Sequence, residues 1–116
     1  MADVQIFHNP ACSKSRGAVE ILREDGIDAE VIEYLRHPLD RQTIERILGL
    51  LGGDAGELVR TDKRFAELSL NAADYTTAEA VADLLMAHPE LMQRPVIVRG
   101  EHAVIARPSE LVRTLF

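Results

Sequence analysis

An apolar run, a helical run and a second apolar run follow one another in the first 34 residues, and this order restricts the fold more than any other feature. Residues 4–7 form a short run that is apolar and partly β-branched, which predicts a strand. Residues 29–34 have the same character and predict a second strand. Residues 13–25 between them predict a helix, because their apolar side chains recur at helical spacing and Gly26 follows as an end signal. A strand–helix–strand unit has a right-handed crossover, so the two strands are expected to be parallel.

The middle of the chain predicts helices and no convincing strand. Asp40 is placed to cap a helix that carries apolar residues on one face, and Gly52 follows that helix. Thr76, with Glu79 three residues later, predicts the start of another helix whose inward residues are expected to be Ala78, Val81, Ala82 and Leu85. Residues 38–90 are therefore interpreted as a helical insertion.

The last part of the chain predicts a hairpin and a terminal helix. Residues 96–98 and 103–106 are short apolar runs separated by Arg99-Gly100, which is typical of an antiparallel pair. Pro108 is expected at the first position of the final helix. The whole order indicates an α/β chain with a thioredoxin/glutaredoxin-like fold (β-α-β, helical insertion, β-β-α) and a four-stranded mixed sheet. We expect residues 1–116 to form a single domain, with the insertion at about 38–90.

Composition limits the compartment and the partners. The chain has 116 residues and one cysteine, so it forms no internal disulfide, and its start lacks the pattern of a signal peptide. No apolar stretch approaches membrane-spanning length. The net charge of -6 argues against broad binding to nucleic acid or to an anionic membrane. We therefore expect a cytoplasmic protein without nucleic-acid or membrane partners, in which any anion site is built locally.

Cys12 lies where the first strand gives way to the first helix. Unpaired backbone N–H groups and the positive end of the helix dipole favour an anion at such a position, so a thiolate is expected. The same N–H groups are suited to hold an oxyanion beside the sulfur. The alternative is a small buried hydrophobic residue, but a core cysteine seldom lies among asparagine, proline, serine, lysine and arginine.

Two neighbours are candidates for assisting Cys12. Ser15 replaces the second thiol of a Cys-x-x-Cys pair, so an adduct formed on Cys12 must be resolved by an external thiol. Ser15 is also placed to donate a hydrogen bond to the thiolate, although a solvent-facing helical serine is an equal alternative. His8, as an imidazolium, would favour the thiolate electrostatically, whereas a neutral histidine packed at a strand end is the alternative.

Three arginines occupy joints between predicted elements, namely Arg60, Arg94 and Arg107. Guanidinium groups match tetrahedral oxyanions through paired hydrogen bonds, so together these three are candidates for an oxyanion site. Arg94-Pro95 is the candidate cis peptide bond, because the residue before this hairpin is where the thioredoxin layout commonly has one. The histidines do not form a metal-ligand spacing with Cys12, so no metal site is expected.

The sequence resembles the glutaredoxin-linked ArsC family of arsenate reductases, which belongs to the ArsC/Spx superfamily, in its short form without a C-terminal extension. The matching strings are His8-Asn9-Pro10-Ala11-Cys12, Ser15-Arg16, Arg94-Pro95-Val96-Ile97-Val98 and Arg107-Pro108-Ser109-Glu110. The resemblance extends in register over nearly the whole chain, including the helical insertion.

The resemblance implies that Cys12 is the nucleophile, that His8 keeps it ionised, and that the three arginines hold arsenate. It further implies reduction of arsenate to arsenite through a thiol-bound arsenic adduct, with electrons from glutathione and glutaredoxin and with no bound cofactor. Two alternatives remain on the same scaffold. One is a thiol-disulfide oxidoreductase that removes glutathione from mixed disulfides without arsenate. The other is an Spx-like regulator that binds RNA polymerase, against which Ser15 argues, since such regulators usually carry Cys-x-x-Cys.

Overall fold

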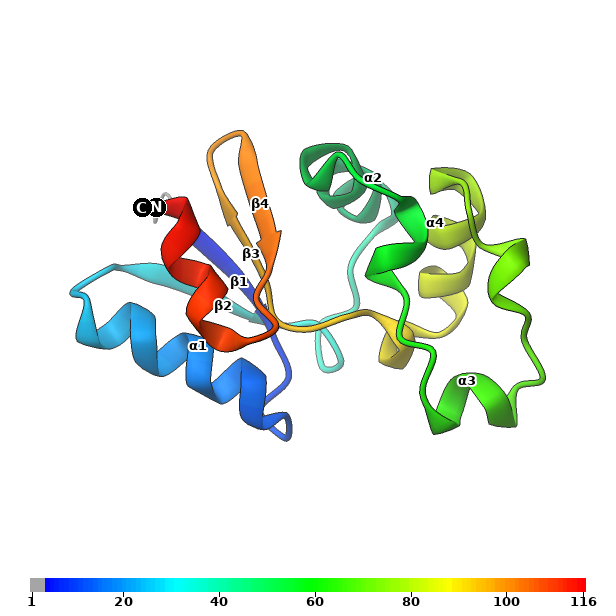
Figure 1. The fold of residues 1–116 in the computed structure, drawn as a ribbon, viewed down its shortest axis with the longest axis horizontal. Coiled ribbons are helices and arrows are strands. Elements are labelled where there is room, and N and C mark those ends of the chain that lie inside the picture. The colour runs from blue at the N-terminus through cyan, green and yellow to red at the C-terminus, as the bar shows by residue number, and fades with distance from the viewer. Residues whose placement is uncertain (1–3) are drawn as a thin grey trace. The chain divides into compact units, whose positions relative to one another are not determined.

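The computed structural model describes residues 4–116, and the chain divides into two compact units (Figure 1). The first unit consists of the chain up to His37 together with Arg94–Phe116, and the second is Pro38–Gln93. The second unit spans the residues expected to form the helical insertion. All of the predicted site residues except Arg60 belong to the first unit.

The first unit is built on a mixed sheet of four strands, which confirms the predicted fold class. The strands are β1 (Val4–His8), β2 (Ala29–Glu33), β3 (Val96–Arg99) and β4 (His102–Ile105). Their order in the sheet is β2-β1-β3-β4. β1 and β2 are parallel, as the strand–helix–strand unit requires, and β3 is antiparallel to both β1 and β4. The carboxyl end of the central strand β1 therefore leads directly into the stretch that holds Cys12.

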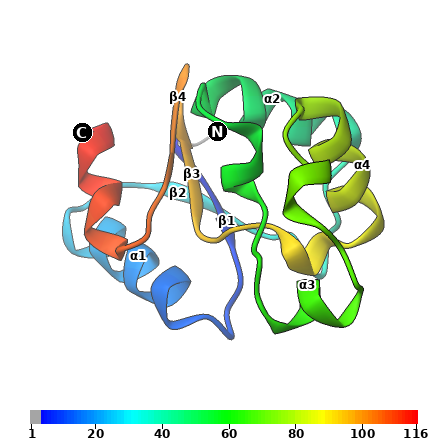
Figure 2. The ribbon, with the colours of Figure 1, turned by 45° about the vertical axis from the view of Figure 1, so that its right-hand side comes forward.

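Two helical elements pack together on the sheet, α1 (Ser13–Glu24) and the C-terminal η4 (Ser109–Leu115) (Figures 1 and 2). Ala18 and Leu22 of α1 and Val112 of η4 are buried in one apolar cluster with side chains of β1 and β3. α1 is followed by Asp25 and then Gly26, whose φ of 71° lies in the left-handed region that glycine tolerates. The predicted end of this helix is confirmed.

The terminal helix differs in type from the prediction. η4 is a 3₁₀ helix, and Pro108 precedes it with an extended ψ of 165° instead of occupying its first turn. The N–H of Leu111 donates to the carbonyl of Pro108 at 3.0 Å, an i to i+3 bond of the tighter helix. A segment this short gains few i to i+4 bonds, so its conformation depends on the packing of residues such as Val112.

The second unit is helical, as expected. Its α-helices are α2 (Arg41–Leu51), α3 (Lys63–Glu67) and α4 (Ala78–Ala87), and its 3₁₀ helices are η1 (Ala55–Leu58), η2 (Ala72–Asp74) and η3 (Pro89–Leu91). The Asp40 side chain accepts a hydrogen bond from the N–H of Thr43 at 2.8 Å, which confirms it as the cap of α2.

The predicted start of α4 is wrong by one residue. Thr77, not Thr76, caps this helix, because its hydroxyl accepts a hydrogen bond from the N–H of Ala80 at 3.2 Å. The predicted inward face is confirmed for Val81, Ala82 and Leu85, which are buried together with Leu84, and it is wrong for Ala78, which is exposed. The two adjacent threonines offer equivalent capping groups, so the sequence pattern alone does not decide between them.

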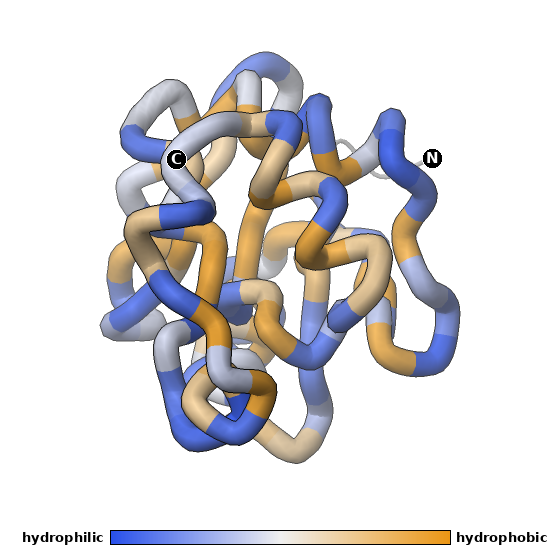
Figure 3. The backbone as a smooth tube through the Cα atoms, turned by 90° about the vertical axis from the view of Figure 1, so that its right-hand side faces the viewer, coloured by the Kyte–Doolittle hydropathy of each residue, from blue (hydrophilic) through white to orange (hydrophobic). Residues whose placement is uncertain are grey.

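Apolar segments along the chain are short and interrupted by hydrophilic ones, as the colouring of the tube in Figure 3 shows. Within residues 4–116, no helix has the length and apolar character needed to cross a membrane.

Candidate active site

Cys12 is the N-cap residue of α1, with extended backbone angles of φ -95° and ψ 124°. The turn that places it is closed by its own N–H, which donates to the carbonyl of Asn9 at 3.0 Å. The Cys12 side chain is partly buried, and its thiol is free. The sulfur therefore lies over the first turn of α1, at the carboxyl end of β1, as the sequence predicted.

Asn9 organises this turn, a function that sequence reasoning did not assign to it. It is 8% exposed, and its side-chain oxygen accepts a hydrogen bond from the N–H of Ala11 at 3.0 Å. A second hydrogen bond links α1 to this turn, because the Arg16 guanidinium donates to the carbonyl of Pro10 at 2.9 Å. Asparagine before proline at a strand end is a typical turn signal and was the clue available in the sequence.

The pKa of Cys12 is lowered from 9.0 to about 7. Burial is the largest single influence and raises the pKa, but the backbone N–H groups of Ser15 and Lys14 and the guanidinium of Arg94 together outweigh it. The sulfur makes no capping hydrogen bond of conventional geometry, so these N–H groups act on it as the positive end of the helix. The expected thiolate is therefore supported.

Arg94 and Arg107 meet in the first unit. The guanidinium of Arg94 helps to lower the pKa of the Cys12 thiol by hydrogen bonding and by its charge, and that of Arg107 donates to the backbone carbonyl of Arg94 at 3.2 Å. Both side chains are only partly exposed. The peptide bond between Arg94 and Pro95 is cis, which confirms the prediction, and the bond between Arg107 and Pro108 is also cis, which was not expected. Arg94 thus acts directly on the Cys12 thiol, and Arg107 contacts the backbone of Arg94.

Arg60 belongs to the second unit, in the joint between η1 and α3 that the sequence indicated. Its guanidinium lies 3.4 Å from a carboxylate oxygen of Asp62, and its side chain is 21% exposed. Its backbone N–H donates to the carbonyl of Leu91 at 2.7 Å. Its part in oxyanion binding stays a prediction.

Ser15 is fully buried, so a solvent-facing helical serine is ruled out. Its hydroxyl accepts a hydrogen bond from the backbone N–H of Asn9 at 3.3 Å and so helps to close the turn before Cys12. The group of Ser15 that acts on the sulfur is its backbone N–H. Donation from the Ser15 hydroxyl to the thiolate stays a prediction.

His8 differs from the expected imidazolium. It is 8% exposed at the end of β1, and burial lowers its pKa below the ordinary 6.5, opposed by Glu33 and assisted by Arg16. His8 is therefore mainly neutral at pH 7, and its Nδ1 has no hydrogen-bond partner among residues 4–116. The sequence places His8 four residues before Cys12 but does not show how deeply its ring is buried, and burial decides its charge.

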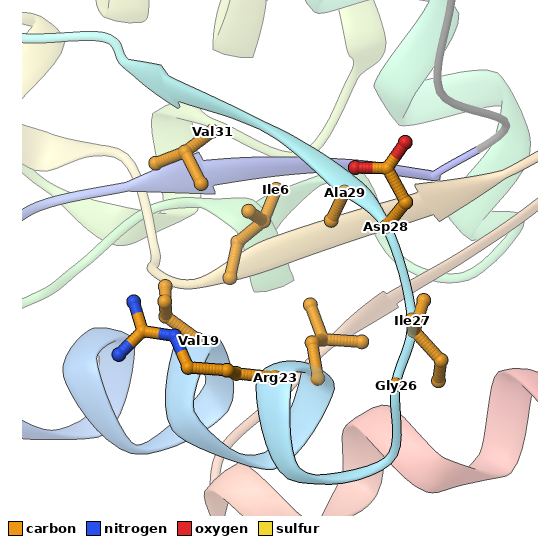
Figure 4. A pocket seen from close by; sticks show the side chains of 9 residues that line it. Ile6, Val19, Arg23, Gly26, Ile27, Asp28, Ala29 and Val31 are labelled. Carbon is orange, nitrogen blue, oxygen red and sulfur yellow. The ribbon is translucent and has the colours of Figure 1, made fainter.

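A pocket of about 310 Å³ also lies in the first unit, between α1 and β2 (Figure 4). Its lining is mainly apolar, from residues such as Ile6, Val19 and Val31, with Arg23 and Asp28 as its charged members. None of the six predicted site residues lines this pocket. The thiol chemistry is therefore expected outside it, at the first turn of α1.

Alkylation of Cys12 should follow a titration with its midpoint close to pH 7. The thiolate is the reactive form, so lowering the pKa to about 7 makes about half of the sulfur ionised at pH 7, against ~1% for a thiol at 9.0. The rate should fall about tenfold per pH unit below the midpoint and level off above it. Iodoacetamide trapping between pH 5 and 10 measures this, and a midpoint above pH 8.5 would contradict the site as described.

Comparison with known proteins gives the site its context. Residues 7–115 match the model of the ArsC family. The chain is 38% identical to an arsenate reductase of Neisseria meningitidis, covering 99% of each chain, and 38% identical to an uncharacterised protein of Escherichia coli K12, YfgD, covering 94% of this chain and 92% of that one. It superposes on an arsenate reductase from Vibrio cholerae with a TM-score of 0.87 and 32% identity, covering 97% of each chain. On this evidence the chain belongs to the ArsC family.

Proposed function

We propose that this protein is an arsenate reductase that uses Cys12 as its nucleophile and takes its electrons from glutathione and glutaredoxin. The observation that carries the proposal is the Cys12 thiol at the N-cap of α1, whose pKa is lowered to about 7 with the help of the Arg94 guanidinium. The similarity to arsenate reductases over nearly the whole chain supports the choice of substrate.

In the first step arsenate binds with its oxygens toward Arg94 and Arg107, and the Cys12 thiolate attacks arsenic. An arsenic–sulfur bond forms, and one arsenate oxygen leaves as hydroxide, which takes up a proton to become water. Guanidinium groups suit this step because they hold two oxygens of a tetrahedral anion in one plane. Arg60 is proposed as a third member of the oxyanion site.

The electrons must come from outside the chain. Cys12 is the only cysteine, so this protein cannot supply the second thiol that reduction of the adduct requires. We propose that glutathione displaces a second oxygen of the adduct, which leaves as water, so that arsenic(V) is bound to both Cys12 and glutathione. The glutaredoxin thiolate then attacks the glutathione sulfur and forms a mixed disulfide, while the electron pair of the broken arsenic–sulfur bond stays on arsenic and reduces it to arsenic(III). Water then cleaves the bond between arsenic and Cys12, which releases arsenite and regenerates the thiol. Overall, arsenate and two thiols give arsenite, one disulfide and water. No bound cofactor takes part, and the cytoplasm, where thiols are kept reduced, is the proposed site of action.

A coupled assay tests both parts of the proposal. The protein is incubated with arsenate, glutathione, glutaredoxin, glutathione reductase and NADPH, and arsenite is measured beside NADPH oxidation. One NADPH should be consumed per arsenite formed, and phosphate in place of arsenate should give no turnover. Absence of arsenite formation with every thiol donor would overturn the proposed substrate.

Two further mixtures separate the reductant from the substrate. If thioredoxin sustains turnover and glutaredoxin does not, the choice of reductant is wrong while arsenate reduction stands. If a glutathionylated peptide is turned over without arsenate and arsenate has no effect, the protein is a thiol-disulfide oxidoreductase instead.

A further inference from the structure

Ser109 joins the C-terminal helix to the first turn of α1. Its hydroxyl donates to the backbone carbonyl of Lys14 at 2.8 Å, a contact between residues 95 positions apart in the chain. Figures 1 and 2 show η4 lying beside α1, which is the arrangement that this bond requires. The Ser109 hydroxyl does not cap its own helix, because Pro108 is the N-cap residue of η4 and makes no side-chain cap.

Gly17 makes this close approach possible. A Cβ atom at position 17 would lie 2.7 Å from the Ser109 hydroxyl oxygen and 3.3 Å from its Cβ. The first of these distances is well inside van der Waals contact, so a side chain at this position would displace the serine. Glycine within a helix costs about 1 kcal/mol relative to alanine, and at this position it leaves room for the contact.

The carbonyl that Ser109 contacts belongs to a peptide group that also faces Cys12. The carbonyl of Lys14 and the N–H of Ser15 are the two ends of one planar peptide unit. The Ser15 N–H is, in turn, the strongest of the influences that lower the pKa of the Cys12 thiol. A hydrogen bond accepted by a carbonyl polarises the N–H of the same peptide and restrains its orientation.

We propose that Ser109 is a positioning residue for Cys12: its hydroxyl holds the Lys14–Ser15 peptide so that the N–H of this peptide points at the Cys12 sulfur. Ser109 does not touch the reacting atoms and acts only through the peptide. The same contact ties the segment that carries Arg107 to the helix that carries Cys12, since Arg107 is two residues before Ser109. The inference concerns the thiol of the proposed reductase, but its test needs no arsenate.

Ser109→Ala is the direct test. Removing the hydroxyl should shift the midpoint of the Cys12 alkylation titration to higher pH and slow alkylation at pH 6 by about two- to twelvefold, the range expected for one hydrogen bond. The limiting rate at high pH should not fall and should rise slightly, because a thiolate of higher pKa is the stronger nucleophile. A purely structural contact would lower the melting temperature and leave the midpoint in place.

Thr114→Ala is the matched control. Thr114 is in the same terminal helix, and its hydroxyl donates to the carbonyl of Leu111 at 2.7 Å, within that helix. This variant also loses one hydroxyl from η4 but no contact with α1, so its midpoint should equal that of the unmodified protein. Both variants leave unchanged the residues that shift the pKa of Cys12 and of His8, namely Lys14, Ser15, Arg94, Glu33 and Arg16.

Three more variants keep the proposal falsifiable if Ser109→Ala folds poorly. Gly17→Ala should shift the midpoint in the same direction by displacing the hydroxyl, and adding Ser109→Ala to it should have little further effect. Ser109→Thr, which keeps a hydroxyl, should shift the midpoint less than Ser109→Ala does. An unchanged midpoint in both Ser109→Ala and Gly17→Ala would overturn the inference, even if arsenate turnover is found. Conversely, shifted midpoints without any arsenate turnover would support it while the proposed function fails.

Discussion

Cys12→Ser is expected to reduce arsenite formation by at least about 1,000-fold, to the rate of the thiol mixture alone, as the loss of a covalent nucleophile does. A serine hydroxyl is almost entirely protonated at pH 7, whereas the Cys12 thiol, with a pKa of about 7, is about half ionised. The chain has no second cysteine to take over the attack on arsenic. Arsenite release, measured in the coupled glutathione assay, reports the loss.

The same substitution should leave the fold intact, which makes it a clean test. Cys12 is the N-cap residue of α1, a position at which serine is among the preferred residues. A serine oxygen there can accept a hydrogen bond from the first turn and stabilise the helix by about 1 kcal/mol. The melting temperature should therefore stay the same or rise. Arsenite formation that survives in a folded Cys12→Ser protein would refute the thiolate mechanism.

Local patterns were sufficient to predict the part of the fold that positions Cys12. The periodicities of residues 4–7, 13–25 and 29–34 gave a parallel β1–α1–β2 unit, which the structure confirms. The end of a strand and the start of a helix are adjacent in sequence, so the location of Cys12 at the N-cap followed from the same patterns. Residue periodicity and the boundary between neighbouring elements are local properties, so a single sequence is enough to predict them.

Contacts between distant residues were not predictable in this way. The bond from Ser109 to Lys14 depends on how η4 packs on α1, and no spacing within either helix indicates it. The neutral state of His8 depends on the burial of its ring, which is a property of the packed unit. The cap of α4 was wrong because two adjacent threonines offer alternatives that differ little in free energy. The type of η4 was wrong because the conformation of so short a segment depends on its packing.

Arg94→Ala is expected to weaken oxyanion binding by about 10- to 150-fold, which corresponds to the loss of a hydrogen bond to a charged group worth roughly 1.5–3 kcal/mol. The Arg94 guanidinium acts on the Cys12 thiol by hydrogen bonding and by its charge, so we expect it beside any anion that this thiol attacks. The measurement is the concentration of arsenate or sulfate that protects Cys12 from alkylation at pH 7.

The substitution should also raise the pKa of Cys12, because the guanidinium favours the thiolate both by hydrogen bonding and by its charge. Alkylation of Cys12 at pH 6, measured without any oxyanion, should accordingly be slower in the Arg94→Ala variant than in the unmodified protein. Arg94→Lys separates the two effects: it keeps the charge and should keep part of the lowered pKa, but it lacks the planar fork and should still bind oxyanions weakly.

Arg23→Ala is the control for net charge in the same unit. Arg23 lies in the last turn of α1, eleven residues after Cys12 and so about 16 Å along the helix. Its guanidinium pairs with Glu20 at 3.5 Å and its side chain is 73% exposed, so salt screens its charge from the site. Oxyanion affinity in this variant should stay within about twofold of the unmodified protein. If Arg94→Ala behaves like Arg23→Ala, Arg94 is not part of the oxyanion site, and the positive charge facing arsenate must come from other residues.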